Sequence, residues 1–232
     1  MNWKPLPKPA EIAETRLLEA ILDNRFPINS HLPGERYLAT QIGITRPTLR
    51  EAMQRLARDG WLDIQHGKPT RVRDYWREGS LAVLAILAQS PAYQSPDFVA
   101  YLMEVRLLLA PTYSLQAFKD STDEIAAQLR RAPEVDSAPA DFARFDWELH
   151  HLLTHRAENP VYRLLLNSFE SLYSIMGKQY FAFDECRQHS HSFYVALLAC
   201  AEENNLDVVE ALTRETMQTS LNLWLKLHGG VE

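Results

Sequence analysis

Two groups of side chains in this sequence have the types and spacing to do chemistry, and the first is cationic. Between residues 36 and 73 the chain holds eight Lys and Arg residues but only three Asp and Glu residues. Arg46 and Arg50 lie one helical turn apart, and an arginine can bridge the O6 and N7 atoms of guanine. Residues 66–68 (His-Gly-Lys) are small and basic enough to approach phosphates. The pattern indicates a surface that meets a polyanion, and a solvated basic face is the alternative.

The second group combines imidazole and carboxylate side chains. Asp146 and His150 are four residues apart, so they share a face if the segment is helical. The other histidines of this half that could join them are His151, His155, His189 and His191. Such ligands suit zinc or a similar ion, with His191 as the third ligand. Solvated or core histidines are the alternative, because Gln218 and Ser220 stand where a last histidine would be needed.

Several isolated side chains in the second half could bind a different ligand. Arg106 lies inside the apolar segment FVAYLMEVRLLLA, where it could face an anionic ligand, pair with a carboxylate or reach the surface. Ser220 and Trp224 are four residues apart and therefore share a helical face. Tyr180 and Tyr194 could line the same interior, although ordinary core packing would explain any one of these residues.

The cationic group lies on a pattern of short helices that would position it. The segment ERYLATQIG ends at Gly43, a favourable residue after a helix. In ITRPTLREAMQRLARDG, Thr45 can cap the next helix, Pro47 is tolerated in its first turn and Gly60 ends it. The buried stripe of that helix would be Leu49, Ala52, Met53 and Leu56. Two helices joined so closely are typical of a helix-turn-helix.

A β-hairpin is predicted directly after these two helices. The segment WLDIQ alternates with Leu62 and Ile64 on one side, and TRVR would return with Val72 facing inward. The turn between them is HGKP, which places residues 66–68 at the tip. Recognition helices present their N-terminal turns to base edges, and the two arginines occupy those turns. Together these features predict a winged helix-turn-helix that binds DNA.

The second half has helical periodicity, without strand patterns or repeats. Helices are predicted at 81–89, 96–118, 122–131, 139–156, 160–177, 187–203 and 206–228. Such a series predicts an antiparallel α-helical bundle, which can enclose a ligand cavity. The sequence has no glycine-rich phosphate loop and no arranged nucleophile, base and orienting group, so an enzyme is not expected.

Charge divides the chain in the same way. The whole chain carries 24 basic and 30 acidic residues, a net charge of −6. Residues 1–75 hold twelve basic and nine acidic residues, whereas residues 76–232 hold twelve and twenty-one. We therefore predict a DNA-binding domain at 1–75 and an all-α effector domain at 76–232.

Two cysteines without a framework, and no apolar run longer than LAVLAILA, are typical of a cytoplasmic protein that does not enter a membrane.

The chain resembles the GntR superfamily of transcription regulators in the segment LPGERYLATQIGITRPTLREAMQRLARDGWL. It resembles the fatty-acid-responsive FadR branch of that superfamily in IQHGKPTRV and, further on, in NPVYRLLLNSFESLY, YFA and SLNLW. The resemblance implies contacts to the major groove and the DNA backbone from Arg36, Thr45, Arg46, Thr48 and Arg50. It also implies minor-groove contacts from His66 and Gly67 and a phosphate contact from Lys68. Pro47 departs from the threonine of that branch.

For the second half, the same resemblance implies a bundle that binds long-chain fatty acyl-CoA. The positions that match the ligand region are Arg106, Tyr180, Ser220 and Trp224. Met217 stands where that branch has glycine. Other GntR regulators hold a metal through an Asp-x-x-x-His helix and two later histidines, and use it to bind small carboxylates. That is the alternative function, with Asp146, His150 and His191 as the candidate ligands.

The sequence therefore predicts a mainly α protein: an N-terminal winged helix-turn-helix with a small β-hairpin wing, followed by a C-terminal antiparallel α-helical bundle. Symmetric half-sites need two reading copies, so a homodimer on a pseudo-palindromic operator is expected. The resemblance implies a regulator of fatty-acid metabolism that represses degradation, can activate synthesis, and leaves its operator when long-chain acyl-CoA binds. No cofactor is expected.

Overall fold

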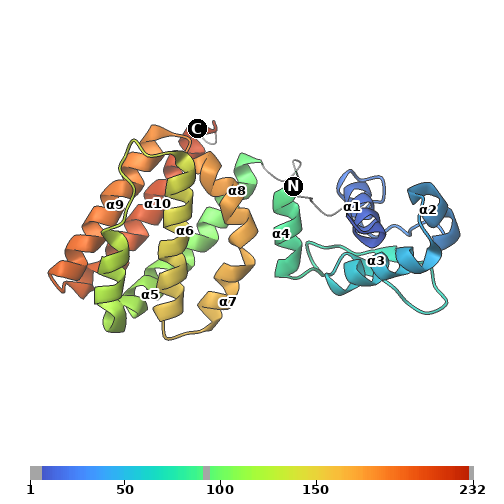
Figure 1. The fold of residues 1–232 in the computed structure, drawn as a ribbon, viewed down its shortest axis with the longest axis horizontal. Helices are drawn as coiled ribbons and strands as arrows, with labels where there is room; N and C mark the ends of the chain where they lie inside the picture. Colours follow the sequence, from blue (N-terminus) through green and yellow to red (C-terminus); the bar gives the residue numbers. More distant parts are fainter. Residues whose placement is uncertain (1–6, 91–94, 230–232) are drawn as a thin grey trace, which may run out of the picture. The chain divides into compact units, whose positions relative to one another are not determined.

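The computed structural model describes residues 7–90 and 95–229. The chain divides into two compact units, Met1–Ile86 and Leu87–Glu232 (Figure 1). The first unit holds short helices and a two-stranded antiparallel sheet, and the second is built of helices. This architecture confirms the predicted fold class, a winged helix-turn-helix followed by an α-helical bundle.

Three helices form most of the N-terminal unit: α1 (Pro9–Leu22), α2 (Glu35–Ile42) and α3 (Arg46–Arg58). Both α1 and α2 pack against α3. The buried residues of α3 are those that the spacing predicts: Leu49, Ala52, Met53 and Leu56. Gly43 ends α2 with a φ of +78°, an angle at which a residue with a Cβ would be strained. This tight turn joins α2 and α3 as a helix-turn-helix.

A small antiparallel sheet follows α3. Its strands are β1 (Leu62–Asp63) and β2 (Arg71–Val72), with Leu62 opposite Val72. Both of these residues are buried, whereas Ile64 is 36% exposed, so Ile64 does not extend their buried side as the alternation suggested. The strand pairing ends at Asp63, and the chain enters the loop of the wing before it reaches Ile64. After β2 the chain forms α4 (Leu81–Gln89).

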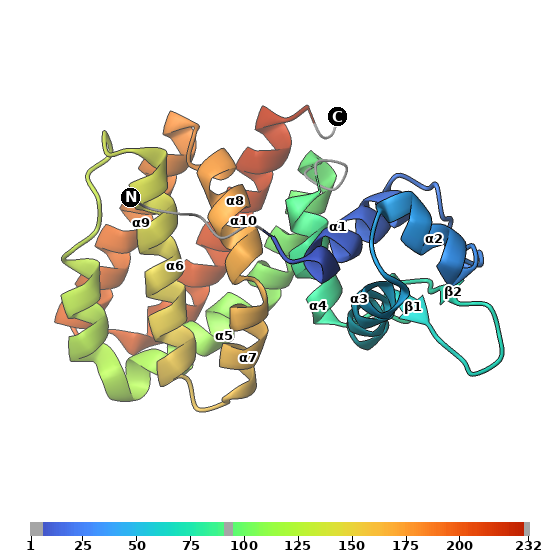
Figure 2. The same ribbon diagram turned by 45° about the vertical axis from the view of Figure 1, so that its right-hand side comes forward.

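The C-terminal unit contains six further α-helices within its described residues (Figure 2). They are α5 (Pro96–Leu129), α6 (Pro139–Arg156), α7 (Val161–Ser168), α8 (Glu170–Tyr180), α9 (Asp184–Glu202) and α10 (Val209–Leu227). α5 is the central helix and packs against α6, α9 and α10. α7 and α8 follow one another along α6, as both ribbon views show.

Three of the predicted helices are joined or divided in the structure. The helices predicted at 96–118 and 122–131 form the single helix α5, which is kinked where Ser121 leaves helical geometry (φ −137°, ψ 27°). The helix predicted at 160–177 is instead divided at Phe169 into α7 and α8. The kink at Ser121 falls in the break predicted between residues 118 and 122, so the sequence located it. The division at Phe169 was not predicted, because apolar periodicity continues across it.

Within the described residues, α5 is the helix that is long and apolar enough to cross a membrane by length and composition. It is nevertheless interrupted by Glu104 and Arg106, and Arg106 pairs with a buried carboxylate of α6. Because α5 packs against three other helices, it is a core helix of the bundle.

Candidate DNA-binding surface and effector pocket

The first turns of α3 present the predicted recognition residues to the outside. Thr45 caps the helix: its hydroxyl accepts a hydrogen bond from the Thr48 backbone N–H (3.4 Å) and lies 2.8 Å from the Thr48 hydroxyl. Arg46 is the first residue of the helix and Arg50 follows one turn later, with side chains 57% and 62% exposed. A capped helix start with two exposed guanidinium groups can donate hydrogen bonds to base edges and phosphates.

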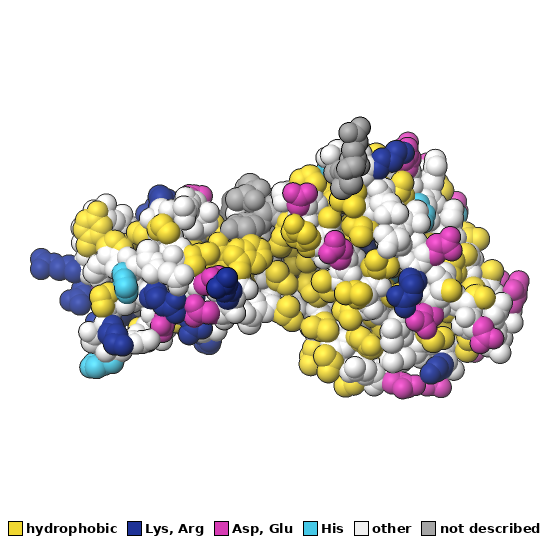
Figure 3. Space-filling model, turned by 180° about the vertical axis from the view of Figure 1, so that it is seen from behind, with side chains coloured by type: hydrophobic (Ala, Val, Ile, Leu, Met, Phe, Trp, Pro, Cys, Tyr) yellow, Lys and Arg dark blue, Asp and Glu magenta, His cyan; other side chains and the backbone are white. Residues whose placement is uncertain are grey.

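The remaining predicted DNA contacts are also exposed on the same unit. Arg36 is the second residue of α2. Gly67 turns the wing with a φ of +73°, beside the exposed His66. The ammonium group of Lys68 donates to the Gln65 side-chain oxygen (2.9 Å). Figure 3 shows Lys and Arg side chains gathered on this unit, so its visible surface suits a polyanion.

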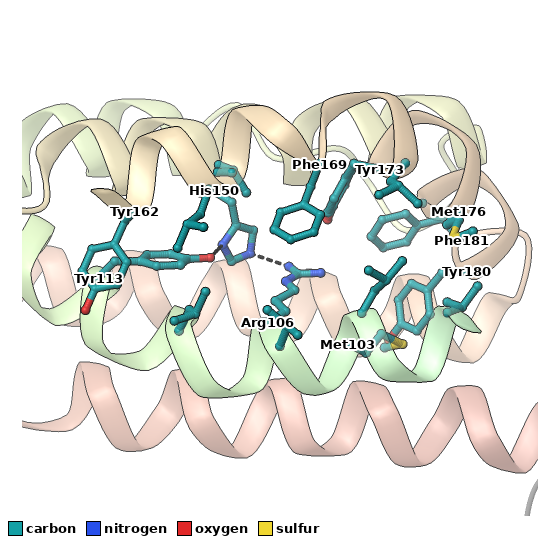
Figure 4. Close-up of a pocket in the computed structure, with 18 residues that line it drawn as sticks. Met103, Arg106, Tyr113, His150, Tyr162, Phe169, Tyr173, Met176, Tyr180 and Phe181 are labelled. Atoms are coloured by element: carbon teal, nitrogen blue, oxygen red, sulfur yellow. Dashed lines mark hydrogen bonds between the residues drawn. The ribbon is translucent and has the colours of Figure 1, made fainter. Parts of the chain in front are cut away.

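An apolar pocket lies between α5 on one side and α7 and α8 on the other (Figure 4). Its volume is about 120 Å³. The apolar side chains of its wall are Val99, Leu102, Met103, Val105, Leu109, Leu165, Leu166, Phe169, Leu172, Met176 and Phe181. Phe169, which lies between α7 and α8, is part of this wall. Such a wall suits a hydrocarbon ligand.

A buried polar centre interrupts this wall at Arg106, about a third of the way along α5. The guanidinium Nη2 of Arg106 donates to Asp146 Oδ2 (2.7 Å) and also to His150 Nε2. The other carboxylate oxygen of Asp146 accepts from the Tyr194 hydroxyl (2.8 Å), and Tyr173 donates to Asp146 as well. In Figure 4, Arg106 and His150 point toward each other across the pocket, between Tyr162 at one end and Tyr180 at the other.

The protonation states of this centre follow from burial and from the charge of Arg106. Burial alone would raise the pKa of Asp146, but the charge of Arg106 and the hydrogen bonds from Tyr194 and Arg106 together outweigh burial, so the pKa is lowered. Burial, reinforced by Arg106, lowers the pKa of His150 to about 3. The neutral imidazole accepts from Arg106 at Nε2, so its Nδ1 carries the proton and donates to the Tyr113 hydroxyl (2.6 Å).

The same contacts bear on the metal ligands considered from the sequence. Asp146 and His150 do meet, but Arg106 binds both of the groups that would coordinate an ion. Within the described residues, no three His, Cys, Asp or Glu side chains come together as a metal site would require. His191 therefore does not complete a site with the other two.

Two buried polar groups of the pocket wall are poorly satisfied within the described residues. The Nε atom of Arg106 is buried without a hydrogen-bond partner, and the buried hydroxyl of Tyr180 lies beside Ser220 and Cys186 without a well-formed hydrogen bond to either. Burial, together with the neighbouring Cys186, raises the pKa of Tyr180, so its hydroxyl stays protonated. A buried donor without an acceptor is costly, and a ligand that brings an acceptor into the pocket would satisfy it.

The other predicted effector residues lie outside the pocket wall. Tyr194 is buried and contacts the polar centre through Asp146. Ser220 and Trp224 are buried on α10, and the Trp224 ring centroid lies 6.4 Å from that of Tyr180. The Trp224 indole N–H donates to the Pro96 carbonyl (2.8 Å). The structure thus brings these residues around Tyr180 and the polar centre, as buried packing partners.

Sequence reasoning missed two residues of the polar centre. Tyr113 and Tyr173 are separated from Asp146 and His150 by about thirty residues of chain, and no spacing connects them. His150 itself was considered only as a metal ligand. Tyr113 and Tyr173 each place a hydroxyl on an otherwise apolar helical face. A single sequence cannot tell such a buried tyrosine from an exposed one.

Comparison with known proteins gives matches across both units. The model of the FadR C-terminal domain matches residues 73–232, and that of bacterial regulatory proteins of the gntR family matches residues 9–72. The chain is 41% identical over 219 residues to the fatty acid metabolism regulator protein of Shewanella sp. strain MR-7, which covers 94% of this chain and 91% of that protein. The protein of the same name from Shewanella oneidensis is 40% identical, with the same coverage of 94% and 91%.

A solved structure supports the fold at much lower identity. It is Lar, which controls the expression of the Listeria monocytogenes agr system. It superposes with a TM-score of 0.65 at 16% identity, over 97% of this chain and 100% of that chain. From the two domain matches and the similarity over most of its length, the chain belongs to the FadR family of fatty acid metabolism regulators, within the gntR family of DNA-binding bacterial regulatory proteins.

Proposed function

We propose that this regulator works in the cytoplasm as a homodimer that binds a pseudo-palindromic operator and is released by long-chain fatty acyl-CoA. In this proposal it represses fatty-acid degradation and can activate synthesis, without a cofactor and without catalysing a reaction. Residues 1–75 read the DNA and residues 76–232 bind the effector. Two copies are needed because symmetric half-sites are read by symmetric protein dimers.

The observation that carries the effector assignment is an apolar pocket whose wall contains the buried, unpartnered Nε of Arg106 and the hydroxyl of Tyr180. The apolar wall suits a hydrocarbon chain, and Arg106 Nε and the Tyr180 hydroxyl could each donate to an oxygen of the ligand. A fatty acyl-CoA offers both features, because its acyl chain is apolar and its thioester carbonyl and the phosphates of its coenzyme A part accept hydrogen bonds. A small carboxylate held by a metal fits less well, because Arg106 already binds Asp146 and His150.

The size of the pocket suggests how ligand binding could reach the DNA. At about 120 Å³ it is smaller than the roughly 300–1,000 Å³ of typical ligand pockets, so a long acyl chain must widen it. α7 is the part of the wall without a single buried residue, and we expect it to move first. A ligand that binds the widened arrangement better shifts the protein toward it. If that arrangement binds operator less well, operator weakens ligand binding by the same factor.

The test is calorimetric titration of oleoyl-CoA into the full-length protein, with and without DNA. The DNA is the duplex that the wild-type protein selects from a random library, called here the selected duplex. We expect the selected duplex to weaken oleoyl-CoA binding about tenfold or more, which corresponds to about 1.4 kcal/mol. Leu166→Trp fills the pocket and should weaken binding at least as much. Leu164→Trp is the matched control, because Leu164 lies on the same helix but is 65% exposed.

Each failure has its own meaning. If the folded wild-type protein does not bind oleoyl-CoA, acyl-CoA is not the effector. If binding is unaffected by the selected duplex, the ligand stands but release from DNA does not. If the two tryptophan variants behave alike, the ligand binds elsewhere in the protein.

A further inference from the structure

Glu35 lies between the two recognition arginines in the DNA-free protein. It is the first residue of α2, and its side chain is 30% exposed. Its Oε2 atom accepts a hydrogen bond from Arg50 Nε at 2.7 Å and lies 3.6 Å from Arg46 Nη2. We infer that Glu35 is a positioning residue that sets the sequence specificity of DNA binding by holding both guanidinium groups. The inference rests on the proposed DNA contacts of Arg46 and Arg50.

The carboxylate has a fixed place from which to do this. α2 packs directly against α3, and the tight turn at Gly43 holds the two helices together. Glu35 stands in the first turn of α2, where the helix dipole stabilises a negative charge. An exposed arginine otherwise loses much side-chain freedom when it binds a base. A guanidinium that is already held loses less, so preorganisation favours the geometry that the correct bases require.

The atoms that Glu35 uses leave the readout atoms available. Arg50 donates from Nε, so its two terminal nitrogens remain for a bidentate contact to guanine. Arg46 is held by charge alone, since 3.6 Å is too long for a hydrogen bond. A guanidinium held in one position can still contact guanine, but it cannot move to reach phosphates in DNA of any sequence. The nearby carboxylate of Glu35 also repels phosphates. Glu35 should therefore weaken binding to DNA of any sequence while it strengthens binding to the correct one.

Glu51, on the recognition helix α3, offers a matched control. Glu51 is 58% exposed and pairs with Arg55 (2.6 Å). Glu51→Gln and Glu35→Gln each remove one negative charge from the helix-turn-helix, but only the second frees Arg46 and Arg50. Glu35→Asp retains the charge and shortens its reach, so it separates positioning from simple charge.

The experiment measures binding of full-length variants to the selected duplex and to a scrambled duplex by fluorescence anisotropy across a salt series. Glu35→Gln should lower the ratio of the two affinities about tenfold, a change of about 1.4 kcal/mol. Its binding to the scrambled duplex should tighten, and the slope of log affinity against log salt should steepen by about 0.9, one extra phosphate contact. Glu35→Asp should also lower the ratio but keep the wild-type salt slope, and Glu51→Gln should keep the wild-type ratio.

Two results would overturn the inference, and they are distinguishable from each other. If Glu35→Gln keeps the same affinity ratio as Glu51→Gln, Glu35 does not position the arginines, and the proposed DNA reading is unaffected. If the wild-type protein prefers no duplex over the scrambled one, the proposed function itself is wrong and the inference falls with it. Thermal unfolding of each variant shows whether a changed ratio reflects a loss of folded protein.

Discussion

Replacing Arg106 with methionine removes the cation that faces the buried carboxylate of Asp146, while most of the side-chain volume is kept. Asp146 is 2% exposed and loses the 2.7 Å hydrogen bond to Arg106 Nη2. Leaving one member of a buried ion pair uncompensated costs about 3–5 kcal/mol. We expect the lower end, because Tyr194 and Tyr173 still donate to the carboxylate and Arg106 is itself 22% exposed.

Urea unfolding at neutral pH, followed by far-ultraviolet circular dichroism, measures this change in the free energy of unfolding. The control is Arg130→Met, which breaks the 2.8 Å pair with Glu202 on the exposed surface of the same unit. That change should cost less than about 1 kcal/mol. In the double variant Arg106→Met, Asp146→Asn the uncompensated charge is gone, so part of the stability should return.

The pH dependence of the same variant gives a second check. Without Arg106, burial raises the pKa of Asp146 above its unfolded value, so stability is retained at acid pH and lost as the pH rises through the folded pKa. The difference between Arg106→Met and wild type should therefore shrink as the pH is lowered. The reasoning is refuted if Arg106→Met costs no more than Arg130→Met, or if the double variant is as unstable as the two single losses added together.

Three further outcomes are expected. Because burial lowers the pKa of His150 to about 3, from 6.5 for a free imidazole, the unfolded chain binds more protons between these values. The free energy of unfolding should therefore decrease as the pH is lowered below about 6.5, by up to roughly 1.4 kcal/mol per pH unit from this group. In a pH series of urea unfolding curves, the free energy of unfolding of His150→Asn should depend less on pH than that of the wild type. Arg46→Ala should lose about 1–3 kcal/mol on the selected duplex and much less on a scrambled one, whereas Lys68→Ala should weaken both; anisotropy titrations that show equal losses for Arg46→Ala would contradict the recognition assignment. Gly79→Ala should cost about 1–3 kcal/mol, because a Cβ there lies 2.3 Å from the Tyr75 carbonyl oxygen, and equal urea midpoints for it and Gly34→Ala, where nothing lies within 4 Å, would speak against that clash.

The sequence predicted the DNA-binding unit in detail because its signals are local. Gly43 and Thr45 act through their own backbone angles and caps, and the stripe from Leu49 to Leu56 lies within one helix. The bounds of α4 and α6 also agree with the predicted ranges 81–89 and 139–156. The misplaced Ile64 shows the limit of this reasoning, because alternation cannot tell where strand pairing stops.

The effector unit was predicted as a bundle, but its interior was not. Arg106 was recognised as unusual within an apolar segment, and three environments remained open for it. The structure decides among them: Arg106 binds Asp146 and His150 and keeps one unpartnered donor in the pocket wall. That outcome depends on which faces of α5 and α6 meet, and apolar periodicity gives a face without naming its partner.

What the sequence by itself determined is therefore the order of the helices, the winged helix-turn-helix and the side chains that it exposes, since caps, turns and periodicity act over a few residues. Only the tertiary structure decided that Asp146 and His150 serve a buried arginine, and that Glu35 stands between Arg46 and Arg50. In each case the partner lies on another helix, eleven to forty-four residues away. Each contact exists only because helix packing, of α5 on α6 and of α2 on α3, brings those particular faces together.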